Sequence, residues 1–279
     1  MRTAEQLRMS RLSLSRSAVL VWTLAQRDLK ARYKGTFLGW LWSLIVPLAT
    51  LGLYALVFGV IFRAQVEPMG NGRDPNYAVW LFLGLIVFNF FSYGLLRSAA
   101  SLWSLAGVLN AVRVPALAPI LASLVAVGLQ MLVELVLYLG VLALFMNVGW
   151  TWLLLPLWAV LFGAFTAGLA LAVAVFAVRY QDVQQLLAVV LTFLFFATPV
   201  MYPLTMVPSD AALGSLGLRE LLGASPVAGF VDLARSLLYG LEPGAPNQWV
   251  YLSGAALIAL GLGLITTSRY GSDVAEWLQ

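Results

Sequence analysis

The chain has 279 residues, of which 62% are hydrophobic and 10% are charged, and its net charge is +4. This composition excludes a water-soluble domain built on one buried core. The sequence contains no cysteine and no histidine, which excludes disulfides, thiol nucleophiles, imidazole bases and the usual zinc ligand sets. Apolar runs recur along residues 1–279 without a long polar linker, so we expect a single all-α integral membrane domain.

A basic segment leads directly into the first apolar run. Its charged residues are Arg27, Asp28, Lys30, Arg32 and Lys34. We expect residues 1–36 to be cytoplasmic and to contain an amphipathic helix that starts near Ser17 and lies along the inner leaflet, with its cations near anionic head groups. Two interpretations stay open: the helix only fixes the topology, or it also docks a cytosolic partner or guides an anionic lipid-linked substrate. No cleavable signal peptide is predicted, so the first span is expected to remain as an anchor.

Six apolar stretches are predicted to cross a bilayer as helices, since a span needs about 20 residues. The predicted spans are Phe37 to Phe62, Tyr77 to Leu96, Ala118 to Met146, Trp152 to Val178, Leu186 to Val200, and Trp249 to Thr267. The first five lie within residues 37–200 and the sixth within residues 248–267. The fifth is short, and we expect its start to reach back towards Gln181.

Lysine and arginine residues are distributed unequally between the predicted loops. Most lie before the first span, between the second and third, between the fourth and fifth, and in the tail at residues 268–279. The remaining loops carry few arginines, which acidic residues offset. By the positive-inside rule, both termini are expected to be cytoplasmic, in agreement with an even number of spans.

Residues 201–247 are apolar, but proline and glycine divide them into pieces too short to cross a membrane. Ser225 before Pro226 is typical of a helix start, and Gly240 of a helix end. The helix between them would have about 14 residues and a length of about 21 Å. We therefore predict two external re-entrant half-helices between the fifth and sixth spans. An amphipathic cap on the outer surface is the alternative.

Glu134 is the one acidic residue deep inside a predicted span, where a carboxylate that faces lipid is costly. It follows Gln130 and precedes Tyr138 at helical spacing, so one face of the third span is predicted to be polar. Glu134 must face protein or water, or be protonated. An interhelical hydrogen bond and a position along a transport pathway both remain open. Asn89, Tyr93 and Arg97 form a similar stripe on the second span.

Aromatic residues are dense in the first, second and fifth spans. Those near span ends are typical of interfacial belts, whereas those at mid-membrane depth could stack on sugar rings. Neither lysine lies in a G-x-x-x-x-G-K-[ST] loop, so the chain is not expected to hydrolyse ATP by that route. Energy for any pumping would come from another subunit or from an ion gradient.

Several sequence blocks occur together and in one order. They are Arg27 to Trp42 with Pro47, Tyr54 and Val57 to Phe62; Asn110 to Pro115 with Pro119; Thr198 to Pro203 with Pro208; and Ser225 to Arg235 with Gly240. Together they resemble the membrane subunits of type-2 ATP-binding cassette exporters for polysaccharides, over nearly the whole chain.

The resemblance implies a homodimer bound to two cytosolic ATPase subunits in the bacterial cytoplasmic (inner) membrane. Such a complex exports lipid-linked O-antigen, teichoic acid or a capsular chain. ATP and magnesium would be bound by the partner, and this chain would hold no catalytic residue, no metal, no cofactor and no nucleic acid. The resemblance places ATPase contacts at Arg27, Asp28, Lys30, Arg32, Lys34, Asn110 and Arg113. The residues expected to line or gate the channel are Tyr54, Phe58, Phe193, Phe196 and Tyr202, together with Glu134.

Two other functions compete with polysaccharide export. An exporter of the same family could carry a small amphipathic drug or a lipid, which needs a lateral cleft rather than a long aromatic channel. A membrane enzyme acting on lipid-linked sugars would need clustered carboxylates or metal ligands near a membrane face. The acidic residues of this sequence are scattered.

Overall fold

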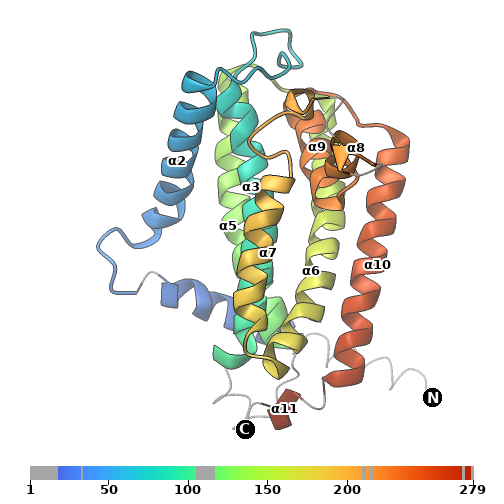
Figure 1. Cartoon of the computed structure of the whole chain (residues 1–279). Coiled ribbons are helices and arrows are strands. Elements are labelled where there is room, and N and C mark those ends of the chain that lie inside the picture. The colour runs from blue at the N-terminus through green and yellow to red at the C-terminus, as the bar shows by residue number, and fades with distance from the viewer. Residues whose placement is uncertain are drawn as a thin grey trace, which may run out of the picture.

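The computed structural model describes most of the chain and shows a bundle of long helices (Figure 1). The described residues are 18–32, 34–104, 117–208, 212–213, 216–271 and 274–277. Within them the fold is all-helical, apart from an antiparallel pair of two-residue strands, β1 (Ala212–Leu213) and β2 (Leu216–Gly217).

Within the described ranges, five helical stretches are long and apolar enough to cross a membrane. In chain order they are Trp42–Ile61, formed by α2 (Trp42–Tyr54) and the π-helix η2 (Ala55–Ile61); α3 (Tyr77–Ser104); α5 (Leu117–Leu144); Trp150–Arg179, formed by the 3₁₀-helix η3 (Trp150–Leu154) and α6 (Leu155–Arg179); and α10 (Pro246–Tyr270). Short helices η1 (Gly39–Leu41) and α11 (Val274–Trp277) flank this set. The long stretches correspond to the first four and the sixth predicted spans.

The fifth predicted span is as short as predicted but is displaced towards its N-terminus. Helix α7 (Val183–Ala197) has 15 residues, which gives a length of about 22 Å, against a hydrocarbon thickness of about 30 Å. It ends because Thr198 precedes Pro199 and adopts an extended conformation, as proline imposes on the residue before it. The prediction of a helix reaching Val200 is therefore wrong, and the early start is confirmed.

Helix α3 occupies the centre of the bundle and α2 its margin. In the most apolar stretch of α3, 78% of the residues are buried, whereas only 6% are buried in the stretch formed by α2 and η2. Figure 1 shows α2 leaning away from the other helices on one side. Most of the α2 surface therefore lies outside the subunit core.

Helices α6 and α10 pack through glycine. A Cβ atom built on Gly168 would overlap the backbone of Ala259, and one built on Gly263 would overlap the backbone of Gly168. Small residues at such crossings are typical of membrane helices, which associate by close backbone packing rather than by a hydrophobic driving force. This close contact holds α10 against α6 at one side of the bundle.

The segment between α7 and α10 contains the short helices η4 (Leu204–Met206), α8 (Leu218–Gly223) and α9 (Pro226–Leu238). The predicted start of α9 after Ser225 is confirmed. Helix α9 packs against α3, α6, η3 and α10, and Trp158 Nε1 donates a hydrogen bond of 3.0 Å to the Phe230 carbonyl. The segment thus contains a helix docked on the bundle.

An N-terminal helix (residues 18–32) crosses the opposite end of the bundle from α8 and α9 (Figure 1). Its Ala25 packs against Ala122 and Ala126 of α5, and all three residues are buried. The predicted helix start near Ser17 lies outside the described residues, which begin at Ala18 within this helix.

Candidate functional site

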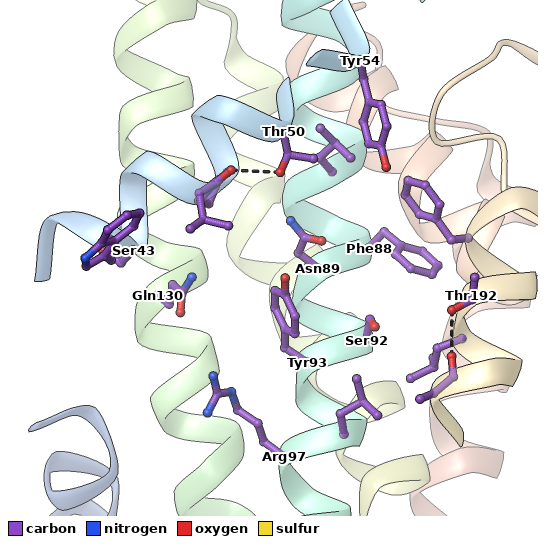
Figure 2. Close-up of a pocket in the computed structure, with 18 of the residues that line it drawn as sticks. Ser43, Thr50, Tyr54, Phe88, Asn89, Ser92, Tyr93, Arg97, Gln130 and Thr192 are labelled. Carbon is purple, nitrogen blue, oxygen red and sulfur yellow. Dashed lines mark hydrogen bonds between the residues drawn. The ribbon is translucent and has the colours of Figure 1, made fainter. Parts of the chain in front are cut away.

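A cavity of about 760 Å³ lies between α2, α3, α5 and α7 (Figure 2). The N-terminal helix contributes one side chain, that of Arg32, to the lining. The lining residues are Arg32, Trp42, Ser43, Val46, Pro47, Thr50, Tyr54, Leu85, Phe88, Asn89, Ser92, Tyr93, Leu96, Arg97, Gln130, Ala188, Leu191, Thr192, Phe195 and Phe196. One wall of the cavity is formed by α2, which belongs to the least buried of the five long helical stretches.

One wall of the cavity is a polar stripe on α3. Ser92 and Tyr93 follow Asn89 by three and four residues, and Arg97 follows Tyr93 by four, so these side chains share one helix face. The sequence pattern predicted three of these residues. Ser92 was not singled out, although the same helical spacing places it beside Asn89. The stripe offers hydroxyl, amide and guanidinium groups to any ligand in the cavity.

The part of the cavity farther from Arg97 is aromatic (Figure 2). The ring centroids of Tyr54 and Phe195 are 6.0 Å apart, those of Phe88 and Phe195 are 5.1 Å apart, and those of Phe195 and Phe196 are 5.5 Å apart. Of the predicted channel residues, Tyr54 and Phe196 thus line the cavity. Phe195 was not among them, yet it follows Leu191 and Thr192 at helical spacing, which was the available signal.

The other predicted channel residues lie elsewhere. The side chain of Phe193 is 73% exposed on the outer face of α7, and the rings of Phe58 and Phe62 lie 5.5 Å apart on η2 and its end. Tyr202 donates a hydrogen bond of 2.8 Å to the Phe196 carbonyl, which ties down the end of α7. Burial raises the pKa of the Tyr202 hydroxyl, so it remains a donor.

The part of the cavity lined by the N-terminal helix is charged and hydrogen-bonded. Arg32 Nη2 lies 2.8 Å from Asp28 Oδ2, and Arg32 Nη1 donates to Gln130 Oε1 at 3.3 Å. Gln130 Nε2 in turn donates to Glu134 Oε1 at 3.1 Å. Glu134 is 3% exposed and is not among the lining residues. It therefore lies behind the cavity wall, in contact with a residue that lines it.

The residues expected to contact an ATPase are divided between several places. Arg27 and Asp28 line a second cavity of about 330 Å³, between the N-terminal helix, α3 and α5. Lys30 and Lys34 are exposed, whereas Arg32 is directed to the main cavity. The two remaining residues, Asn110 and Arg113, lie outside the described residues.

The cavity combines aromatic rings with many hydrogen-bonding groups. Sugar rings present apolar C–H faces to aromatic side chains and hydroxyls to polar ones, so this lining is suited to a polyhydroxylated ligand. Among the residues that the structure describes, no group of three or more acidic side chains could hold a metal ion.

The comparison with known proteins decides the family. Residues 19–216 match the family model described as "ABC-2 type transporter". The chain belongs to the ABC-2 type transporter family. The matched region includes the N-terminal helix except its first residue and every helix that borders the cavity.

Curated relatives of this ABC-2 type chain are named for polysaccharide export. It is 30% identical to an O-antigen export system permease protein RfbA of Myxococcus xanthus, over 79% of this chain and 80% of the relative. It is 25% identical to RfbA of Klebsiella pneumoniae, over 90% and 92%. It is 26% identical to the polysialic acid transport protein KpsM of Escherichia coli, over 92% and 95%. The resemblance drawn from the sequence motifs is confirmed.

Proposed function

We propose that this chain is the channel-forming permease subunit of an ATP-driven exporter of lipid-linked polysaccharide, such as O-antigen, teichoic acid or a capsular chain. It acts in the bacterial cytoplasmic membrane as a homodimer, with both termini cytoplasmic. Two copies of a cytosolic ATPase subunit bind ATP and magnesium. The names of the relatives and the dense basic segment before the first span support this assignment.

The observation that carries the proposal is the cavity next to a poorly covered α2. Exposed apolar side chains continue over the outer faces of α2 and α7, for example Leu53, Val189 and Phe193. A second copy of the chain placed against these faces would bury them. It would also close the sideways-open cavity into a channel shared by the two subunits, with Tyr54 and Phe196 along its path.

The transport cycle follows from this placement. ATP binding closes the ATPase dimer, and the N-terminal helix moves with it. The two subunits then separate along α2 and α7, and their cavities join into a continuous passage. Sugar rings stack on the aromatic cluster, while their hydroxyls bond to Asn89 and Tyr93. Hydrolysis resets the gate, so the polymer advances in steps.

Vesicle reconstitution tests the assignment. The purified chain is placed in vesicles with or without the ATPase of its own complex, and a labelled lipid-linked glycan is supplied. We expect glycan delivery only with the ATPase and ATP. Equal delivery without the ATPase would contradict the proposal. Delivery of a short amphipathic lipid but no glycan would favour the competing lipid exporter, and glycan modification without any ATPase would favour the membrane enzyme.

Filling the cavity provides a residue-level prediction. Asn89→Trp places an indole in the middle of the cavity, where it obstructs a passing sugar ring. We expect glycan export to fall by about tenfold or more, which corresponds to about 1.4 kcal/mol in a rate barrier. Leu257→Trp, at a side chain of α10 that is 70% exposed, is the matched control and should export normally. Equal export by both variants would exclude this cavity from the path.

A further inference from the structure

Four polar side chains form a continuous chain from the N-terminal helix into the bundle. Asp28 is paired with Arg32 at 2.8 Å, Arg32 donates to Gln130 at 3.3 Å, and Gln130 donates to Glu134 at 3.1 Å. The first two belong to the N-terminal helix and the last two to α5. The contact between Arg32 and Gln130 thus joins segments 98 positions apart in the sequence.

This chain of contacts is buried towards Glu134, whereas the side chain of Asp28 at its other end is 40% exposed. The side chain of Arg32 is 11% exposed and Glu134 is 3% exposed. Arg32 Nε is buried and has no hydrogen-bond partner among the described residues. A guanidinium removed from water is costly unless its partners hold it, so its position here depends on Asp28 and Gln130.

The donor and acceptor chemistry assigns a role to Glu134. A guanidinium only donates hydrogen bonds, so the Gln130 amide must turn its oxygen towards Arg32. The amide nitrogen then points the other way and needs an acceptor, which is Glu134 Oε1. Glu134 therefore fixes the orientation of the amide and, through it, the position of Arg32.

The neighbouring apolar contact is of a different kind. Ala25 packs on Ala122 and Ala126, and methyl contacts of this sort are not directional. Hydrogen bonds to a charged group are directional and stronger than neutral ones. The polar chain is therefore the contact that fixes how the N-terminal helix is aligned along α5.

We propose that Glu134 is a positioning residue which acts on Arg32 through Gln130, and that this polar chain transmits movement of the N-terminal helix to the cavity wall. Arg32 and Gln130 both line the cavity, so a displacement of the helix changes the inner end of the passage directly. The inference rests on the proposed function, because the movement is imposed by the ATPase.

Exchange of the two side chains on α5 tests the proposal. In vesicles with the ATPase, Q130L is expected to lower the glycan exported per ATP hydrolysed by about fivefold or more, in the range of couplings between sites. Q130E alone sets two carboxyl groups against each other and is expected to be similarly impaired. In the double variant Q130E/E134Q, the carboxylate at position 130 accepts from Arg32 and the amide at position 134 donates to that carboxylate. This variant should recover the wild-type ratio of glycan exported to ATP hydrolysed. Q65L, at an exposed glutamine of the outer loop, is the matched control.

The hydrogen-exchange rates of the backbone amides at residues 18–32 measure, without any substrate, how firmly the polar chain holds the N-terminal helix. It should be faster in Q130L than in the wild type and should return to the wild-type rate in the double variant. The proposal is overturned if Q130L keeps the wild-type export ratio, or if the double variant stays as impaired as Q130E. If the wild type exports no glycan with ATP, the proposed function fails, and the exchange rates still decide whether the polar chain holds the helix.

Discussion

Replacing Arg235 of α9 with methionine is expected to lower the free energy of unfolding by about 2–6 kcal/mol, because each buried carbonyl that loses its partner costs about 1–3 kcal/mol. Arg235 is 7% exposed, and its Nη1 and Nη2 each donate a hydrogen bond of 2.7 Å, to the carbonyls of Pro199 and Val200. Its guanidinium also lies 3.3 Å from the ring centroid of Trp80, a cation–π contact that methionine cannot make.

Arg219→Met is the matched control for this prediction. Arg219 also donates to backbone carbonyls, those of Leu204, Thr205 and Val207, but its side chain is exposed, so water can replace it. Thermal unfolding in lipid nanodiscs should separate the two variants clearly. Equal unfolding temperatures would show that Arg235 does not hold the outer segment in place.

The consequence for transport follows from where Arg235 binds. Its two acceptors lie directly after α7, the helix that carries Phe195 and Phe196 into the cavity. Arg235 therefore ties α9 to the end of α7 and, through Trp80, to α3. The outer segment and the aromatic part of the cavity are expected to move as one unit.

Gly168→Ala is expected to destabilise the fold by about 1–3 kcal/mol, the usual cost of overpacking. The added Cβ would overlap the Ala259 backbone, so α6 and α10 must separate along their crossing. In the same helix, a Cβ on Gly163 would meet nothing within 4 Å. Gly163→Ala is therefore the control, and it should be neutral or slightly stabilising because alanine is the better helix former. Thermal unfolding in lipid nanodiscs compares the two variants. Equal effects of both substitutions would contradict the packing argument.

The features that neighbouring residues determine, such as a helix start or the polar face of a helix, were predicted from the sequence. The start of α9 was read from Ser225 and Pro226, and the polar face of α3 from the spacing of Asn89, Tyr93 and Arg97. The end of α7 was placed too late, because apolar character continues through Val200 while the backbone already turns at Thr198. In that case the conformational restriction before proline outweighed hydrophobicity.

Contacts between distant segments could not be predicted from the sequence. Arg235 was placed on a predicted external re-entrant half-helix, and nothing near it in the sequence indicates its burial against Trp80. The polar face of α5 was predicted from Gln130 and Glu134, but its partner Arg32 was expected to face an ATPase. The choice between Phe193 and Phe195 likewise depends on how α7 is rotated against α2 and α3.

The central claim is that glycan passes through the cavity between α2, α3, α5 and α7. A photoreactive benzophenone side chain is introduced at position 89 inside the cavity or at position 257 on the outer face of α10, and each complex is illuminated while it turns over labelled glycan. We predict label attached at position 89 only when ATP and the ATPase are both present, and none at position 257. Equal labelling at both positions, or none at position 89 during active export, would contradict the account.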